Sequence, residues 1–377
     1  MSSNYDGVLA IELNDNINVL YDSYGRPFKS LRISITYACN FNCFFCHREG
    51  IDGLIKDELE WYEFSIIARI ARKLGAEDVK ITGGEPLLKK GLVELISELN
   101  NYGYENIGVS TNGYLLRDQA KELVQAGLKR INVSLHSLNR ERFKLITGVD
   151  ALNRVLEGLM EVKEYDIPVF INFTVLKGIN DKEIFDIIKF AINNDFNIHL
   201  IELHPVGKAK SNFNIYHTFP QEVLKFLETQ ASRVEVRPLH YRLRYIVSGS
   251  VIEIVQPVSN PLFCAGCMRI RVSPDGKLYP CLNSFSEYVD TKEILRNPYL
   301  SENEKVQLIE DAFLKVNEMR KPYNLWNLDY EKNFYSNYTD EVKRLRKRIS
   351  RLYIPKRMST KVSRNSRSKT KMGLPNS

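Results

Sequence analysis

The chain has 377 residues, with 53 lysines and arginines against 46 acids, and a formal net charge of +7. This length is sufficient for a large core and about two domains. The positive charge is concentrated at one end, because residues 341–377 hold thirteen basic residues and one acid, which leaves −5 on the other 340 residues. The overall charge therefore does not make the greater part of the chain a polyanion-binding protein.

Cysteine use and hydropathy argue against secreted and membrane proteins. All six cysteines belong to two triplets with ligand-like spacing, so we expect no disulfides and a reducing, cytoplasmic location. The first residues, MSSNYDGVLAIELND, lack the basic start and apolar run of a secretory signal. No apolar stretch approaches the roughly eighteen residues that span a membrane, so we expect no membrane association.

Residues 31–203 alternate strand-like and helix-like patterns. The helices between the strands are amphipathic; over 181–194, Ile184, Ile187, Ile188 and Ala191 form one apolar stripe. Repeated strand–helix units predict parallel strands joined by right-handed crossovers. We therefore predict an α/β fold, an incomplete (β/α)6 barrel, with strands at 31–36, 78–82, 106–111, 130–135, 169–176 and 198–203.

The pattern changes after residue 205. A helix is predicted at 221–230, followed by short strands at 234–237, 241–247 and 251–255 and by the second cysteine triplet. The expected organisation is an N-terminal extension (1–20), the barrel (21–204), a smaller domain that carries the second triplet (205–320) and a C-terminal extension (321–377). The Ser-, Lys- and Arg-rich tail is typical of a disordered, solvated segment. Contact between this tail and RNA is the weaker alternative, because no aromatic residues interleave with its charges.

The first triplet follows the first predicted strand. Cys39, Cys43 and Cys46 stand in the segment TYACNFNCFFC, on the loop at the carboxyl end of that strand, where parallel α/β barrels place their chemistry. Iron–sulfur cubanes normally take four thiolates, so three cysteines leave one iron open to a reactant. The alternative is a set of buried cysteines or part of a zinc knuckle, since structural zinc takes four ligands.

The second triplet is Cys264, Cys267 and Cys281. Its spacing fits either zinc completed by a distant histidine such as His240 or a further cluster with an open iron. Arg269 and Arg271 alternate along a strand-like segment within it, so both point to one face. Two guanidinium groups on one face can clamp phosphate oxygens, although an exposed charged edge would look the same in sequence.

Several motifs together resemble a known family. The CxxxCxxC loop, TGGEP at 82–86 and the strand end NVS at 132–134 are similar to those of the radical S-adenosylmethionine superfamily. The second triplet encloses RIR at 269–271 and DGKL at 275–278, and YDSYGRP at 21–27 precedes the barrel. In this combination the chain resembles the GTP 3',8-cyclases (molybdenum cofactor biosynthesis protein A, archaeal branch), over about residues 20–320.

The resemblance implies the fold, the cofactors and the reaction. The fold would be the radical SAM partial barrel with a smaller C-terminal cluster-binding domain. The cofactors would be two 4Fe-4S clusters, on the two cysteine triplets, and S-adenosylmethionine. The reaction would be the radical cyclisation of GTP to (8S)-3',8-cyclo-7,8-dihydroguanosine 5'-triphosphate, a lyase step that begins molybdenum cofactor biosynthesis. S-adenosylmethionine would contact Phe45, Gly84, Ser134 and His204.

Some of the residues with which the family contacts GTP are present in this sequence and others are replaced. Arg32, Lys80, Ser110, Arg269 and Arg271 stand where the family binds this substrate, with Lys80 where many members have arginine. Phe170 stands where the family has a lysine that contacts GTP, and His204 stands where many members have methionine. The ending LPNS also lacks the double glycine that enters the active site in the family.

The implied partners are GTP, a reductant protein for the clusters and, downstream in the pathway, cyclic pyranopterin monophosphate synthase. Two alternatives stay open from the sequence. One is a radical SAM enzyme with the same auxiliary cluster that modifies a peptide or a different nucleotide, which the departure at Phe170 permits. The other is a non-catalytic zinc protein that binds RNA through its tail.

Overall fold

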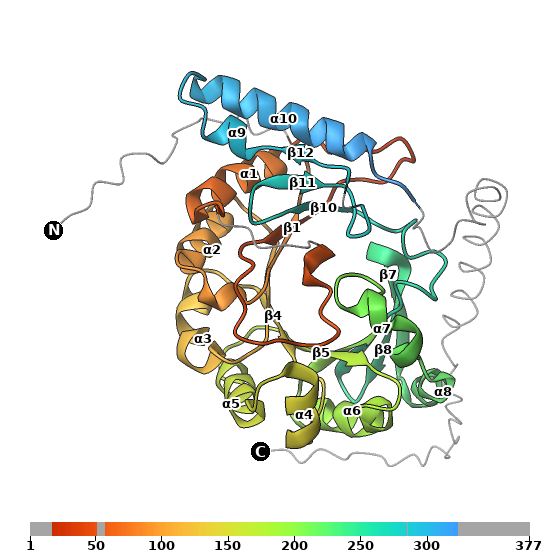
Figure 1. The fold of residues 1–377 in the computed structure, drawn as a ribbon. Helices are drawn as coiled ribbons and strands as arrows, with labels where there is room; N and C mark the ends of the chain where they lie inside the picture. The colour runs from red at the N-terminus through yellow and green to blue at the C-terminus, as the bar shows by residue number, and fades with distance from the viewer. Residues whose placement is uncertain (1–16, 51–56, 285, 323–377) are drawn as a thin grey trace, which may run out of the picture.

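The computed structural model describes residues 17–50, 57–284 and 286–322. Its strands form one sheet in the order β12-β11-β10-β1-β2-β3-β4-β5-β6-β9-β8-β7, which curves into an open barrel (Figure 1). The strands are β1 Ser30–Ser34, β2 Asp78–Thr82, β3 Asn106–Thr111, β4 Arg130–Ser134, β5 Val169–Val175, β6 Asn197–Glu202, β7 Arg233–Arg237, β8 Arg242–Val247, β9 Ser250–Val255, β10 Arg269–Val272, β11 Lys277–Tyr279 and β12 Val289–Asp290.

The six strands predicted for the barrel are β1 to β6, and each pairs in parallel with the next. The prediction of an incomplete α/β barrel is therefore confirmed. The later strands extend this same sheet at both edges, because β9 pairs in parallel with β6 and β10 pairs in parallel with β1. This pairing satisfies backbone groups that the edges of a six-stranded sheet would leave open. The domain boundary at 204/205 stays a prediction.

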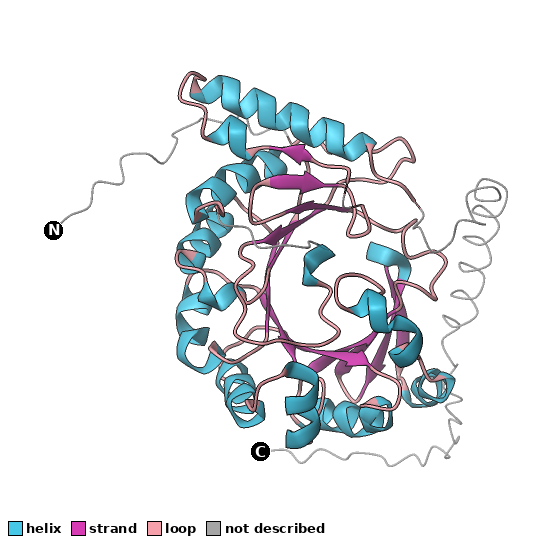
Figure 2. Cartoon of the chain, in the orientation of Figure 1, coloured by secondary structure: helices cyan, strands magenta, loops and turns pink. Residues whose placement is uncertain are grey.

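Helices surround the outer face of the strands (Figure 2). The last long helix, α10, packs beside α1, where the rings of Phe28 and Phe313 stack at 5.6 Å. The α-helices are α1 Trp61–Lys73, α2 Leu92–Asn101, α3 Leu116–Gln125, α4 Arg140–Thr147, α5 Leu152–Lys163, α6 Ile184–Asn193, α7 Ala209–Tyr216, α8 Gln221–Gln230, α9 Lys292–Leu295 and α10 Glu302–Glu318. Short 3-10 helices are η1 Arg48–Gly50, η2 Pro86–Leu88, η3 Asp181–Glu183 and η4 Leu239–Tyr241.

The two faces of the barrel strands differ in polarity. Successive side chains of a strand point to opposite faces. In β1, Leu31 and Ile33 are fully buried in the hydrophobic core, whereas Arg32 between them lines an internal cavity. In β4, Ile131 and Val133 belong to that core. The hydrophobic core therefore lies between the strands and the outer helices, and the inside of the barrel is free for polar chemistry.

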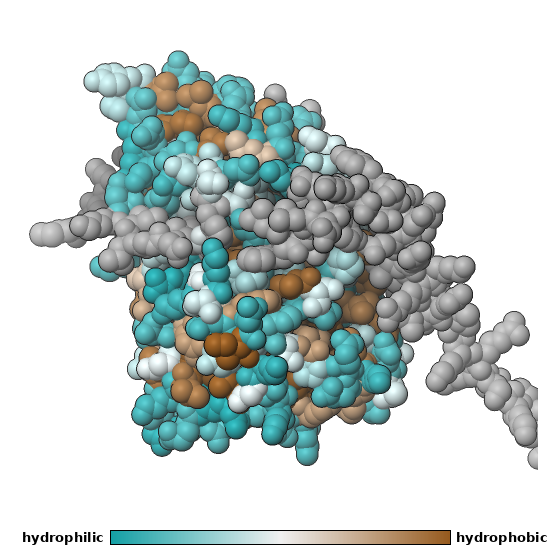
Figure 3. All heavy atoms as spheres, turned by 45° about the vertical axis from the view of Figure 1, so that its right-hand side comes forward, coloured by the Kyte–Doolittle hydropathy of each residue, from teal (hydrophilic) through white to brown (hydrophobic). Residues whose placement is uncertain are grey.

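Hydrophobic side chains also reach the surface in places. On the face shown in Figure 3 they form patches interrupted by hydrophilic side chains. Single exposed apolar residues are normal on protein surfaces. Among the residues that the structure describes, no helix is long and apolar enough to cross a membrane.

Candidate active site

A cavity of about 260 Å³ lies inside the barrel. Its walls are the inward-facing side chains of the central strands and the loops that carry the second cysteine triplet. Of the residues singled out from the sequence, the cavity brings together Arg32, Lys80, Ser110, His204, Cys264, Cys267, Arg269, Arg271 and Cys281. The spacing of Arg269 and Arg271 thus does place both guanidinium groups on the cavity side of one strand, β10.

The first cysteine loop is held by the TGGEP segment after β2. The Gly84 N–H donates to Thr36 O at 2.7 Å, and the Glu85 N–H donates to Ala38 O at 2.7 Å. A Cβ on Gly84 would lie 2.2 Å from Ala38 O and 2.6 Å from Tyr37 O. Only glycine permits this approach without displacement, so Gly84 places the backbone that leads into Cys39.

The sulfur environment fits iron–sulfur clusters at both triplets. Backbone N–H groups donate to Cys39 Sγ, Cys46 Sγ and Cys281 Sγ, each at 3.4 Å, and such bonds stabilise thiolate sulfur. Burial, with the neighbouring Cys46 and Cys39 thiols, raises the pKa of Cys43 to about 12, and a metal charge beside this thiol would favour its ionisation.

The positions of the cysteines are compatible with a four-iron cluster. No group of three His, Cys, Asp or Glu side chains in the described part of the chain is placed to hold one metal ion. A four-iron cubane does not require that convergence, since each thiolate binds a different iron. His240, considered as a zinc ligand, lines the cavity and stacks on Phe263 with ring centroids 3.9 Å apart, and its Nδ1 is buried without a hydrogen-bond partner.

Two buried arginines that also line the cavity hold the second cysteine loop. Arg26 Nη1 donates to Cys264 O at 2.7 Å, and Arg320 Nη2 donates to Cys267 O at 2.5 Å. Asp22 accepts from Arg26 Nε at 2.8 Å and fixes its orientation. The motif at 21–27 therefore acts on the second triplet, more than two hundred residues away.

Glu49 links the two cysteine loops and was not predicted from the sequence. It is buried in η1, just after Cys46, and accepts from Arg32 Nη2 at 2.7 Å and from Arg271 Nη1 at 2.6 Å. The surrounding cations hold the pKa of this carboxyl well below its usual range despite burial. An ionised Glu49 therefore orients two of the arginines that were expected to contact GTP.

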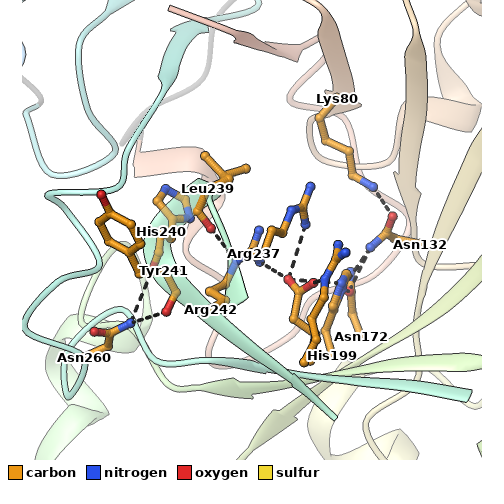
Figure 4. A network of polar contacts seen from close by, with 12 residues as sticks. Lys80, Asn132, Asn172, His199, Arg237, Leu239, His240, Tyr241, Arg242 and Asn260 are labelled. Atoms are coloured by element: carbon orange, nitrogen blue, oxygen red, sulfur yellow. Dashed lines mark hydrogen bonds and ion pairs between the residues drawn. The ribbon is translucent and has the colours of Figure 1, made fainter. Parts of the chain in front are cut away.

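A chain of polar side chains crosses the cavity wall (Figure 4). Lys80 Nζ donates to Asn132 Oδ1, and Asn132 Nδ2 lies 3.1 Å from His199 Nδ1. His199 Nδ1 is also 2.8 Å from Asn172 Oδ1. Burial lowers the pKa of His199 well below its ordinary value, which keeps the ring neutral. The sequence did not predict site roles for Asn132, Asn172 and His199, although strand alternation places Asn132 on the same face as Ser134.

Phe170 takes part in the packing behind this wall. Its ring stacks on His199 at 4.7 Å, and the Arg130 guanidinium lies 5.8 Å from the ring centroid. Phe170 is 7% exposed and is not among the residues that line the cavity. It supports Arg130 and His199, which do line it.

The residues expected to contact S-adenosylmethionine lie in different surroundings. His204 lines the cavity, its Nε2 is buried without a partner, and burial lowers its pKa to about 3. The Phe45 ring meets His136 edge-on at 4.9 Å, and Ser134 ends β4. Phe45, Gly84 and Ser134 are not among the cavity-lining residues, so their contacts with this cofactor stay predictions. The basic tail and its ending lie outside the described residues.

Comparisons with known proteins define the class of enzyme. Residues 33–191 match the Radical SAM superfamily, and residues 196–325 match Molybdenum Cofactor Synthesis C. Two solved structures share the fold. SuiB from Streptococcus suis has a TM-score of 0.56 and 14% identity, covering 76% of this chain and 69% of that chain. The structure of anSMEcpe has a TM-score of 0.51 and 15% identity, covering 84% of this chain and 99% of that chain. The chain is a radical S-adenosylmethionine enzyme with a second cysteine site.

Relatives of similar length identify the family. A "Probable GTP 3',8-cyclase" of Saccharolobus solfataricus is 44% identical over 309 residues, which cover 80% of this chain and 98% of the relative. That of Sulfurisphaera tokodaii is 42% identical over 319 residues, covering 84% and 99%. The chain belongs to the GTP 3',8-cyclase family, and its cofactors are two 4Fe-4S clusters and S-adenosylmethionine.

Proposed function

We propose that this protein converts GTP to (8S)-3',8-cyclo-7,8-dihydroguanosine 5'-triphosphate, the first step of molybdenum cofactor biosynthesis. The observation that carries the proposal is the internal cavity, which joins the second cysteine triplet to a wall of arginines. Arginine groups bind phosphate oxygens through paired hydrogen bonds. A nucleoside triphosphate needs one group that faces its base and others that bind its phosphates, and the cavity lining offers cysteines for the first and arginines for the second.

The chain's residues have distinct proposed roles. Cys39, Cys43 and Cys46 hold the cluster that, with S-adenosylmethionine, supplies a 5'-deoxyadenosyl radical when bound. Cys264, Cys267 and Cys281 hold the second cluster beside the guanine base. Arg32, Lys80, Arg269 and Arg271 bind phosphate oxygens, and Ser110 faces the substrate from β3.

The walls of the site position the reacting atoms and exclude water. Removal of the 3' hydrogen of GTP and attack of C3' on C8 of guanine both require the ribose and the base to be fixed. Glu49 supports this by orienting Arg32 and Arg271 from the first cysteine loop. The same contact couples the positions of the two loops, so that the site where the radical forms and the substrate site keep a fixed relation.

The proposed partners follow from the reaction. A reductant protein supplies electrons to the clusters, and cyclic pyranopterin monophosphate synthase takes the product. All six cysteines are free thiols in the structure, which supports a reducing cytoplasm as the location.

Anaerobic reconstitution tests the proposal. Iron and sulfide should give about eight irons per chain. With GTP, S-adenosylmethionine and a strong reductant, loss of GTP should match formation of 5'-deoxyadenosine. The double variant Arg269→Met/Arg271→Met should lose GTP turnover but keep slow uncoupled cleavage of S-adenosylmethionine. Arg140→Met, which removes an exposed arginine paired with Asp150, is the control.

Two outcomes would contradict the proposal. Cleavage of S-adenosylmethionine that ignores GTP in the unsubstituted enzyme would favour the alternative, a peptide or a different nucleotide. Normal cyclisation by the double variant would remove the two arginines from substrate binding.

A further inference from the structure

A second group of arginines lines the cavity, on a wall to which the resemblance assigns no role. Arg130 from β4, Arg237 from β7 and Arg242 from β8 reach it, and we call them, with the buried Glu253 of β9, the Glu253 wall. Arg237 and Arg242 line the same cavity as His199 and Lys80, and Figure 4 shows these four side chains in one view. The wall is assembled only by the tertiary fold, because its residues come from four strands.

One carboxylate, Glu253, orients Arg237 and Arg242 of this wall and also contacts Arg244. Glu253 is fully buried, and its oxygens lie 3.3 Å from Arg237 Nη1, 2.8 Å from Arg242 Nη1 and 2.7 Å from Arg244 Nε. His199 Nε2 lies 3.7 Å from the same carboxylate, but burial keeps this ring neutral. Three guanidinium groups therefore share a single negative charge.

The positive charge of the wall exceeds its negative charge. Lys80 donates to two neutral oxygens, Val109 O at 3.3 Å and Asn132 Oδ1, and Arg130 Nε is buried without a hydrogen-bond partner. Asp78 is the one acid among the described residues that line the cavity. Buried charges are costly unless they are paired, so the wall is suited to a multiply charged anion.

The backbone leaves room for these side chains to meet. Gly108 pairs with Lys80 of β2 on one side and with Arg130 of β4 on the other. A Cβ on Gly108 would lie 3.3 Å from Lys80 Cδ and 3.5 Å from Arg130 Nε. The glycine thus lets both long side chains pass over β3. Phe170 supports the Arg130 guanidinium from below by a cation–π contact.

The electrostatic state of the wall agrees with an anion site. Burial, followed by the charge of Arg130, lowers the pKa of Lys80 well below its ordinary value. Burial and the nearby Arg237 lower the pKa of Arg130 to about 10. Arg130 still carries its charge at neutral pH, and an added anion would relieve the mutual repulsion of these groups.

We propose that Arg130, Arg237 and Arg242, together with Lys80, bind the terminal phosphates of the nucleoside triphosphate. This inference rests on the proposed function for the identity of the ligand, and it extends the phosphate site from Arg269 to the opposite wall. The Glu253 wall then sets the preference of the enzyme for a triphosphate over a nucleoside.

Equilibrium binding to the reconstituted enzyme tests the inference, with GTP, guanosine and inorganic triphosphate as separate ligands. Arg130→Met should lower the affinity for GTP and for inorganic triphosphate by roughly 10- to 100-fold, the loss expected for a hydrogen bond to a charged group. The affinity for guanosine should not change. Arg130→Lys keeps the positive charge but loses the paired hydrogen bonds of a guanidinium group. Its affinity for GTP and inorganic triphosphate should therefore lie between those of the unsubstituted enzyme and Arg130→Met. Arg140→Met is the control, because Arg140 is exposed, pairs with Asp150 and does not line the cavity.

The outcomes separate this inference from the proposed function. Unchanged binding of GTP and inorganic triphosphate by Arg130→Met would overturn the inference. An equal loss of affinity for guanosine and for GTP would also overturn it. Absence of inorganic triphosphate binding by the unsubstituted enzyme would also overturn it. If Arg130→Met loses affinity for inorganic triphosphate but keeps its affinity for guanosine, this result would support the inference even if the enzyme did not cyclise GTP.

Discussion

The close approach of Gly84 to the first cysteine loop gives a sharp test of how that loop is built. In Gly84→Ala the new Cβ would lie 2.2 Å from Ala38 O, where ordinary contact begins at 3.4 Å. The loop must therefore move by about 1 Å, because both neighbours are backbone atoms. Such a shift breaks the hydrogen bonds from Gly84 to Thr36 and from Glu85 to Ala38.

The expected cost follows from these contacts. Two lost hydrogen bonds contribute about 1 kcal/mol each, and overpacking adds about 1 to 3 kcal/mol. Gly84→Ala should therefore lower the free energy of unfolding by about 3 to 5 kcal/mol. Because the displaced segment leads into Cys39, iron at the first triplet should fall towards zero while the second triplet keeps its cluster.

Urea unfolding of the apoprotein and iron content after reconstitution are the assays. Gly103→Ala is the control, since its Cβ meets nothing within 4 Å and the cost is only the strain of alanine at φ +74°. That strain is worth about 1 to 2 kcal/mol. Full iron content in Gly84→Ala, with stability no lower than that of Gly103→Ala, would refute the reasoning.

Two further predictions concern buried charge. Glu49→Gln leaves Arg32 and Arg271 without their shared carboxylate and should destabilise the protein by about 3 kcal/mol, measured by thermal unfolding; an unchanged melting temperature would contradict this. Burial lowers the pKa of His136 from 6.5 to about 4. Between these pH values the unfolded chain binds a proton on this ring and the folded protein does not, so the stability present above pH 6.5 is lost as the pH falls through 4. The loss should be about 3 kcal/mol, and His136→Gln should flatten the urea-unfolding profile between these values; an equally steep profile in the variant would exclude His136 as the cause.

Much of the active centre could be predicted from the sequence because its signals are local. Cys39, Cys43 and Cys46 lie within eight residues, so their spacing fixes a shared site in any fold. Strand periodicity predicted β2 and β3 at the observed residues, because alternation of apolar and polar side chains records which face is buried. Arg269 and Arg271 share a face for the same reason.

The partners of these local features were decided by the tertiary structure. Pairing of β9 with β6 and of β10 with β1 joins strands that are far apart in the chain, and no periodicity records which distant strands meet. The pairing of β9 with β6 brings Glu253 to His199, and the pairing of β10 with β1 sets Arg271 beside Arg32, where both contact Glu49. The sequence by itself determined the cysteine triplets, the barrel strands and the family. Only the assembled sheet decided which buried carboxylate orients which arginines, because ion pairs between distant segments depend on distances that local sequence does not encode.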